Sequence, residues 1–308
     1  CTSQPLPILS QKQIKPLVSI VLISTLVIGI LYINKFQEDT LNQERNFFGY
    51  KAVRDKMVED ERRVMLQHGM TNHGYQIYLD NEPQILPVSY YGSSAGVGKA
   101  FSFLRSRNLE KPKVAIAGLG SGGLLAYCQP EDEFTIFEID PDVYTLAKEN
   151  FTYLKHCPKA EVIISDARLG LMEVNAKQGD EVYDLISIDA YADDLVPFHL
   201  LTTEAVALYK DLLKTDGVIA IHLSSRYLDL LPVIKAVAED NNLAARYFID
   251  TKPDKFSTIS VWAILAKDED IFAHETFSGL SDFSQVEKRV LWTDTYSALL
   301  PIVRMGNR

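Results

Sequence analysis

Cysteine is scarce in this sequence, which has three cysteines among 308 residues: Cys1, Cys128 and Cys157. They form no CxxC pair and no paired framework, which favours a reduced compartment over a disulfide-stabilised scaffold. No base stands near Cys128 or Cys157 in the sequence, so both are expected to be inert.

Positive charge is also in short supply. The chain has 31 Lys and Arg against 41 Asp and Glu, which gives a net charge of −10. A nucleic-acid-binding surface would normally be basic, so this balance argues against that class of partner. It is compatible with a cationic small substrate.

The sequence begins with Cys1 rather than methionine, which indicates a fragment of a longer chain or, alternatively, a lipidated N-terminus. An uninterrupted apolar run follows from Leu17 to Ile33, flanked by Lys15 and Lys35. Its length is at the short end of the range for a membrane-spanning helix, and no signal-peptide cleavage site follows it. We therefore predict a lead over 1–15 and a transmembrane helix over 16–34 in the inner membrane.

A glycine-rich turn is the feature around which the rest of the sequence is organised. A short apolar strand, 114–117, precedes Gly118, Gly120 and Gly122, and a second strand ends at Glu138. Glycines allow a sharp turn and close approach of a ligand, and an acid about 20 residues later can bind ribose hydroxyls. The crowded glycines favour S-adenosylmethionine or a derivative over a dinucleotide.

Acidic residues follow two further predicted strands. Asp166 ends the strand 162–167, and Asp189 ends the strand 183–189. In a parallel sheet the carboxyl ends of the strands lie on one edge, where ligands bind. One such acid could simply cap the next helix, but several along one edge predict a ligand site.

Strands and helices alternate over residues 95–308, which predicts an α/β, Rossmann-like sheet of the S-adenosylmethionine-dependent methyltransferase type. Residues 35–94 have a different sequence pattern. A polar linker over 37–46 is followed by short segments in which apolar and polar residues alternate. Those segments predict a small antiparallel β domain. His68 and His73 lie in this part, and since no third ligand is identifiable, no metal site is predicted.

The chain resembles the spermidine synthase family, most closely its membrane-fused bacterial branch. The resemblance covers roughly residues 45 to 305 and depends on seven segments, which are Arg45-Asn46-Phe47-Phe48-Gly49, His68-Gly69-Met70-Thr71-Asn72-His73-Gly74, Tyr90-Tyr91-Gly92, Phe137-Glu138-Ile139-Asp140-Pro141, Asp166-Ala167-Arg168-Leu169, Asp189-Ala190-Tyr191-Ala192-Asp193-Asp194 and Trp292-Thr293-Asp294. It implies a polyamine aminopropyltransferase that uses decarboxylated S-adenosylmethionine without a metal. It also implies a homodimer. The nucleoside chemistry predicts that the catalytic domain lies in the cytoplasm, where such cofactors are made.

The resemblance implies roles for individual residues. Gly118, Gly120 and Gly122 would form the turn under the cofactor, Glu138 would hold the ribose, and Asp166 and Ala167 would face the adenine. Asp189 would be the general base, with Tyr90 lining the amine pocket and Asp193 or Asp194 holding the amine.

Three departures from the family pattern keep other functions open. Ser121 and Gly92 stand where the family has acids, and the acidic motif after Asp189 is stretched by a residue. These changes favour, as alternatives, a methyltransferase that uses intact S-adenosylmethionine on an unknown acceptor, or a non-catalytic membrane-tethered sensor of a nucleoside or polyamine.

Overall fold

The computed structural model describes residues 11–69, 71–191 and 197–304 of the chain, which divides into two compact units, Cys1–Leu41 and Asn42–Arg308. The described part of the first unit is mainly the helix α1 (Gln11–Glu38). Within the described ranges, no helix is long and apolar enough to span a membrane. The membrane helix predicted over 16–34, and the membrane partner that depended on it, are therefore not supported.

The second unit is built on a seven-stranded sheet with the strand order β11-β12-β10-β9-β6-β7-β8. Neighbouring strands from β10 to β8 are parallel, whereas β12 runs antiparallel to both β10 and β11. The strands are β6 (Lys113–Ala117), β7 (Glu133–Glu138), β8 (Glu161–Ile164), β9 (Tyr183–Ile188), β10 (Leu213–His222), β11 (Ala244–Asp250) and β12 (Ser260–Ala266). The mostly parallel α/β sheet predicted from the sequence is confirmed, and it has the fold of a methyltransferase-type domain.

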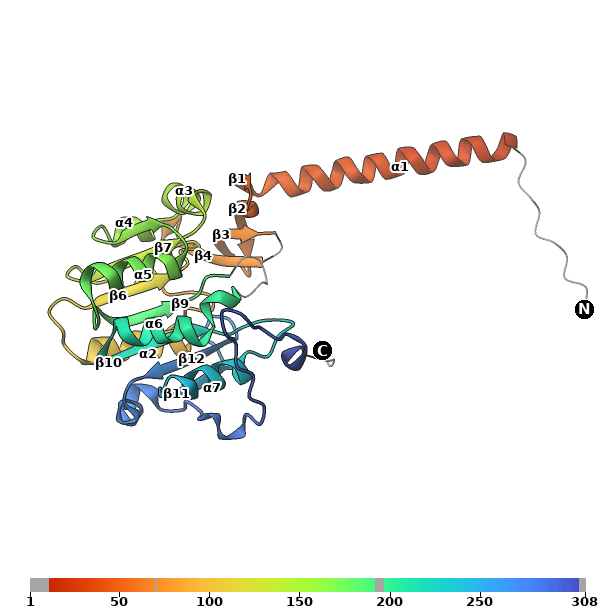
Figure 1. Cartoon of the computed structure of the whole chain (residues 1–308). Coiled ribbons are helices and arrows are strands. Elements are labelled where there is room, and N and C mark those ends of the chain that lie inside the picture. The colour runs from red at the N-terminus through yellow and green to blue at the C-terminus, as the bar shows by residue number, and fades with distance from the viewer. Residues whose placement is uncertain (1–10, 70, 192–196, 305–308) are drawn as a thin grey trace, which may run out of the picture. The chain divides into compact units, whose positions relative to one another are not determined.

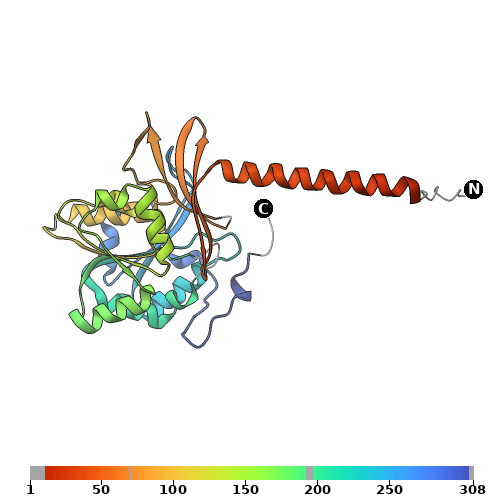
Figure 2. The ribbon, with the colours of Figure 1, turned by 90° about the horizontal axis from the view of Figure 1, so that it is seen from above.

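Helices cover both faces of this sheet (Figure 1; Figure 2 shows the two groups on opposite sides). The helices are α2 (Gly96–Ser106), α3 (Pro141–Asn150), α4 (Tyr153–His156), α5 (Ala167–Gln178), α6 (Thr203–Leu212) and α7 (Leu231–Asp240). Alternate side chains of β6 enter the two cores: Val114 and Ile116 pack with α2, α3 and α4, while Ala115 and Ala117 pack with α5, α6 and α7. This period-two alternation of apolar side chains is what a strand buried on both faces requires.

A smaller antiparallel sheet precedes the main one, in the order β1-β2-β3-β4-β5. Its strands are β1 (Thr40–Asn46), β2 (Gly49–Val58), β3 (Glu61–His68), β4 (Thr71–Leu79) and β5 (Glu82–Pro83). The small sheet is as predicted, but the expected polar linker over 37–46 is wrong in its second half, which is the strand β1. Because β1 lies at the sheet edge and is largely exposed, it carries no apolar alternation that the sequence could reveal.

A buried lysine joins the small sheet to the main one. Lys51 of β2 is fully buried and forms an ion pair with Asp140, which follows β7. Asn46 accepts a 2.7 Å hydrogen bond from the Lys51 ammonium and donates another of 2.7 Å to Asp140. Asp140 also caps α3 by accepting from the backbone N–H of Asp142. This network holds the small sheet against the carboxyl edge of the large one.

The cysteines behave differently from the prediction. Cys128 and Cys157 form a disulfide with their Cα atoms 5.8 Å apart, so the expectation of unpaired cysteines is wrong. Cys128 follows a short 3-10 helix, η1 (Gly123–Tyr127), and Cys157 follows α4. The fold brings these two ends together across 29 residues of sequence, a contact that cysteine spacing does not reveal. The segment after Asp140 forms two helices, because the buried, extended Phe151 separates α3 from α4.

Candidate active site

Residues at the carboxyl ends of four adjacent strands meet around one space. Gly118 follows β6, Glu138 ends β7, Asp166 follows β8 and Asp189 follows β9. The strand order reverses direction between β6 and β9, and the crevice at such a switch point is where open α/β sheets bind ligands. A cavity of about 260 Å³ lies there, and all four residues line it. We call it the first cavity.

The glycine turn is shaped by close backbone packing. Gly118 has a φ of +94°, and a Cβ there would lie 2.3 Å from the carbonyl oxygen of Asp189. Gly120 has a φ of +53°, and its Cβ would lie 2.6 Å from the carbonyl oxygen of His73. Only glycine fits both the torsion and the space. Gly122, by contrast, begins η1 and lines neither this cavity nor the second one described below.

Glu138 is fixed by the backbone and remains able to accept further hydrogen bonds. One carboxylate oxygen accepts from the N–H of Leu119 and the other from the N–H of Asp140, each at 2.9 Å. Burial raises the pKa of Glu138 above its usual range, and these two N–H donors oppose that rise. A carboxylate has about four acceptor positions, so the arrangement fits two ribose hydroxyls.

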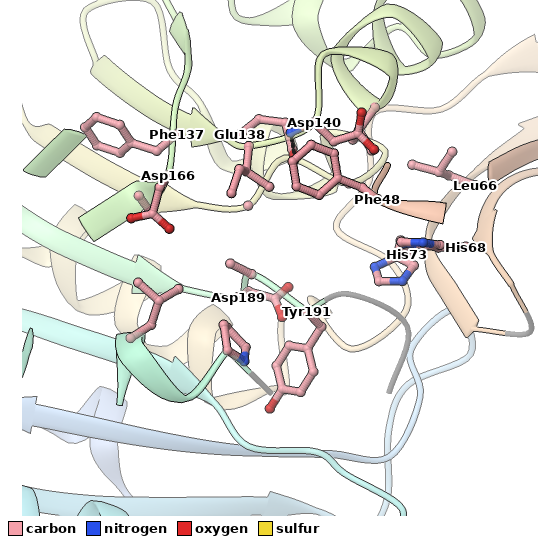
Figure 3. A pocket seen from close by; sticks show the side chains of 18 of the residues that line it. Phe48, Leu66, His68, His73, Phe137, Glu138, Asp140, Asp166, Asp189 and Tyr191 are labelled. Carbon is pink, nitrogen blue, oxygen red and sulfur yellow. Dashed lines mark hydrogen bonds between the residues drawn. The ribbon is translucent and has the colours of Figure 1, made fainter. Parts of the chain in front are cut away.

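Asp166 lies at the other end of the cavity and makes two contacts that hold the structure there (Figure 3). It caps α5 by accepting from the N–H of Leu169 at 3.0 Å, and it pairs with Nε2 of His199 at 2.8 Å. The hydrogen bond from His199 lowers the pKa of Asp166 below its usual range. Ala167 lines the cavity beside it, together with apolar residues that suit a flat ring: Phe137, Ile139, Pro197 and Leu200.

Asp189 is buried, with 9% of its surface exposed, and side-chain groups of two aromatic residues contact its carboxylate. The hydroxyl of Tyr91 donates to its Oδ2 at 2.5 Å, and Nδ1 of His222 lies 2.7 Å from its Oδ1. An ionised carboxylate can only accept, so Nδ1 carries the hydrogen, and Nε2 can accept from the hydroxyl of Ser224 at 2.8 Å. Asp189 is thereby held in one orientation.

Aromatic rings fix the histidine that contacts Asp189. The ring of His222 stacks on Tyr90 with centroids 4.5 Å apart and on Trp262 with centroids 4.8 Å apart. Burial raises the pKa of Tyr90 and of Tyr91 well above the usual range, so both hydroxyls stay protonated at neutral pH. The protonated hydroxyl of Tyr91 therefore donates to Asp189, and the ring stack fixes the orientation of His222.

A second cavity of about 420 Å³ adjoins the first one. The two share four lining residues, His73, Tyr90, Asp189 and Tyr191. Most of the remaining described residues around the second cavity carry hydroxyl or amide groups, namely Thr71, Asn72, Ser89, Ser224, Ser225, Thr258 and Ser260. Asp189 is thus the acid at the boundary between an apolar, acid-edged cavity and a hydroxyl-rich one.

The predicted site residues separate into groups. The structure brings Gly118, Gly120, Glu138, Asp166 and Ala167 to the first cavity, and Tyr90 and Asp189 to the boundary. Asp193 and Asp194 lie outside the described residues. Among the described residues, no three His, Cys, Asp or Glu side chains are placed to hold a metal ion.

Ser121, which replaces an acid of the family pattern, does not face either cavity. It is 1% exposed, lines neither cavity, and its N–H donates to the carbonyl of His73 at 3.1 Å. Its side chain packs against Gly74, where a Cβ would lie 2.3 Å from the Ser121 oxygen. A larger acidic side chain would have no room in this position as the turn is now packed.

Three functional residues were missed by sequence reasoning. His222 and Tyr91 hold Asp189, and His199 pairs with Asp166. The sequence places Tyr91 beside Tyr90 and puts both histidines near the carboxyl edge, but it does not show which of them face the acids. Asp294 forms an ion pair with Arg168 at 2.5 Å. This ion pair joins two of the segments that carry the family resemblance.

Comparisons with known proteins agree with this architecture. No family model matches the chain. A protein from Vibrio vulnificus (strain CMCP6) described as a polyamine aminopropyltransferase is 33% identical over 121 residues, which are 38% of this chain and 40% of that protein. The chain is similar to an aminopropyltransferase. Since the match spans well under half of the relative, it does not by itself transfer an activity.

Solved structures show the fold. A probable spermidine synthase from Corynebacterium glutamicum ATCC 13032 superposes with a TM-score of 0.58 over 87% of this chain and 98% of that one, at 14% identity. Spermidine synthase from Thermotoga maritima gives a TM-score of 0.45 over 73% of this chain and 77% of that one, at 17% identity. The first of these covers most of the chain and supports the fold described above.

Proposed function

We propose that this protein is an enzyme that transfers an aminopropyl group from decarboxylated S-adenosylmethionine to an amine, with Asp189 as the general base. The observation that carries the proposal is the position of Asp189 between two cavities of different chemistry. A reaction between a nucleoside donor and an amine needs both substrates bound at once, with a proton acceptor where they meet.

The first cavity supplies the donor site in this proposal. Glu138 accepts hydrogen bonds from the ribose hydroxyls, and the apolar residues beside Ala167 hold the adenine, with Asp166 accepting from its amino group. The glycine turn then directs the sulfonium toward Asp189, because Gly118 lies against the backbone of that residue. The polyamine aminopropyltransferase among the relatives supports this choice of donor.

Asp189 accepts the proton that makes the amine nucleophilic. An alkylamine is protonated at neutral pH and cannot attack in that form. The amine nitrogen then forms a bond to the donor carbon while the carbon–sulfur bond breaks, and the sulfur leaves as a neutral thioether that needs no acid. Tyr91 and His222 are hydrogen-bonded to the carboxylate and hold it in one orientation before the amine arrives.

Methyl transfer from intact S-adenosylmethionine is the second candidate, and Ser121 favours it. The family pattern has an acid there that binds the amine end of the aminopropyl chain, whereas Ser121 is buried away from both cavities. A donor without that anchoring requirement would explain the change.

Product analysis distinguishes the candidates. The protein is incubated with amine mixtures and either intact or decarboxylated S-adenosylmethionine, and the products are identified by mass spectrometry. Methylthioadenosine together with an aminopropylated amine supports the proposal. S-adenosylhomocysteine would establish the methyltransferase instead, and tight nucleoside binding without either product would indicate a sensor.

A further inference from the structure

A chain of hydrogen bonds connects Asp189 with a serine of the second cavity. Nδ1 of His222 lies 2.7 Å from Oδ1 of Asp189, and Nε2 lies 2.8 Å from the hydroxyl oxygen of Ser224. All three residues line the second cavity. The side chains of His222 and Asp189 are only 7% and 3% exposed, whereas Ser224 is half-buried. Ser224 is therefore the member of the chain that a ligand in this cavity reaches most easily.

The surroundings of the chain set the direction of its hydrogen bonds. The backbone N–H of Val261 donates to Oγ of Ser224 at 2.9 Å and so occupies one of its two lone pairs. The hydrogen of the Ser224 hydroxyl is then directed at Nε2 of His222, because Nδ1 of that ring donates to the Asp189 carboxylate. Each hydrogen thus points along the chain toward the negative charge, and one lone pair of Oγ remains for a ligand.

A second hydroxyl on the same wall also lacks a protein partner. Ser260 precedes Val261 on β12, is 1% exposed and lines the second cavity. Its Oγ has no hydrogen-bond partner among the described residues. A buried hydroxyl without a partner is unfavourable, and the N–H groups of a bound amine would supply one. The hydroxyls of Ser224 and Ser260 therefore indicate where an amine binds.

We infer that Ser224 receives the proton of the acceptor amine and passes its own hydrogen to His222, so that Asp189 acts on the amine through a relay. This inference rests on the proposed function and deepens it. The ammonium of the acceptor gives a proton to Oγ of Ser224 while the Ser224 hydrogen moves to Nε2 of His222. The proton is then held by the hydrogen-bonded pair of His222 and Asp189, which acts as one base.

The remaining steps follow from the neutral amine. Its nitrogen forms the bond to the donor carbon, the carbon–sulfur bond breaks, and the sulfur leaves with the bonding electron pair as a neutral thioether. Ser224 has regained a hydroxyl hydrogen, and the proton on His222 returns to solvent once the product has left. The relay consumes no further reactant.

Serine variants test the first step of the relay. The rate of methylthioadenosine formation is measured with saturating decarboxylated S-adenosylmethionine and 1,4-diaminobutane. Ser224→Ala should lower kcat by at least about tenfold, whereas Ser224→Thr, which keeps a hydroxyl, should stay within a few-fold of wild type. The matched control is Ser94→Ala: this serine is also half-buried, donates to Asp250 at 2.6 Å and lines neither cavity, so the control should react as wild type does. A wild-type kcat in Ser224→Ala would overturn the inference.

The pH profile separates a relay from a purely positioning role of His222. In His222→Asn an amide N–H can still donate to Asp189, but no ring nitrogen remains to take the Ser224 hydrogen. A carboxyl group titrates below an imidazole, so kcat should fall and the acid limb of its pH profile should move to lower pH. A lower kcat with an unmoved acid limb would mean that His222 only positions Asp189, and it would contradict the relay.

Other titratable groups do not produce the same shift. Among the described residues, the other titratable or charged side chains that contact the ring or line the second cavity are those of Tyr90, Tyr191, His73, Arg226 and Arg304. Burial raises the pKa of Tyr90 and of Tyr191 well above the usual range, so neither contributes to the acid limb. Arginine stays charged throughout. All of these residues are present in both wild type and His222→Asn, so the comparison isolates His222.

Nitrogen NMR of the histidine rings separates failure of this inference from failure of the proposed reaction. In protein labelled with 15N-histidine, the His222 ring is identified by its absence from His222→Asn. The relay requires a ring at neutral pH that carries its hydrogen on Nδ1 alone, and an Nε2 signal that shifts in Ser224→Ala. If both are seen but no product forms from either donor, the relay stands and the proposed transfer falls. If product forms but Nε2 carries a hydrogen, the transfer stands and the relay falls.

Discussion

The two cavities that meet at Asp189 are built in different ways. The first cavity is formed by strand ends, and its acids are tied to backbone N–H groups: Glu138 to Leu119 and Asp140, and Asp166 to Leu169. The second is formed partly by the strands β4, β10 and β12 and partly by loops and the C-terminal segment, and hydroxyl groups and arginines line it. The difference teaches that the acids of the first cavity are fixed by the backbone at the edge of the sheet, whereas part of the wall of the second cavity belongs to loops, which can change without altering the sheet.

The acids at the carboxyl edge of the large sheet also differ in how they are held. Asp140 and Asp166 each cap the helix that follows, so the simple capping role considered for such acids is real for both. Among the described residues, Asp189 caps no helix, and its carboxylate is contacted by the side chains of Tyr91 and His222. We therefore expect the largest effect on chemistry from Asp189 and effects mainly on binding or stability from the others.

Removing the base should break the reaction while leaving both cavities intact. Asp189→Asn keeps the size of the side chain but cannot take a proton, so kcat should fall by at least about 100-fold. Donor affinity, measured by calorimetry with methylthioadenosine, should stay within a few-fold of wild type. A variant that turns over at the wild-type rate would show that Asp189 is not the base.

Changing Glu138 should affect the first cavity alone. Glu138→Gln replaces an acceptor oxygen with an amide that faces a backbone N–H, so the affinity for methylthioadenosine should fall by about tenfold or more. Binding of the acceptor amine, titrated without nucleoside, should not change. Equal losses for both ligands would mean that the two cavities are not separate sites.

Loosening Asp189 should give an intermediate effect. Tyr91→Phe removes one of the two side-chain donors and leaves His222, so kcat should fall by about tenfold, as for one lost hydrogen bond to a charged group. Steady-state rates at saturating substrates measure this effect. The matched control is Tyr296→Phe, which is exposed and lines neither cavity, and it should react as wild type does.

The smallest effect is expected outside both cavities. Arg168 lowers the pKa of Asp294 by a hydrogen bond, and a carboxyl whose folded pKa is depressed contributes stability above its unfolded pKa and loses it as pH falls through the folded pKa. Arg168→Met should therefore lower the free energy of unfolding at pH 7 by about 0.5 kcal/mol, since the pair is partly exposed. Urea unfolding should show this difference at pH 7 and its disappearance below about pH 3, with turnover unchanged.

Sequence reasoning reached the sheet and the donor side of the site because both follow from local patterns. A glycine or an acid follows each of four successive predicted strands, namely Gly118, Glu138, Asp166 and Asp189. The parallel topology then brings these residues to one edge of the sheet. The acceptor side could not be predicted in this way. The positions of Arg226 and Arg304 depend on how the loop after β10 pairs with the C-terminal segment, which no local period encodes.

The errors have equally physical causes. The disulfide between Cys128 and Cys157 joins two segment ends that are neighbours only in the folded chain. The strand β1 is polar because it lies at an edge.

Simultaneous binding tests the central claim most directly, because the account requires two sites that meet at Asp189. Ornithine and 1,4-diaminobutane are titrated calorimetrically, one at a time, into protein saturated with methylthioadenosine and into protein alone. The account predicts that at least one of these amines binds the saturated protein with an affinity within a few-fold of that for the free protein. Exclusion of both amines by methylthioadenosine would contradict it.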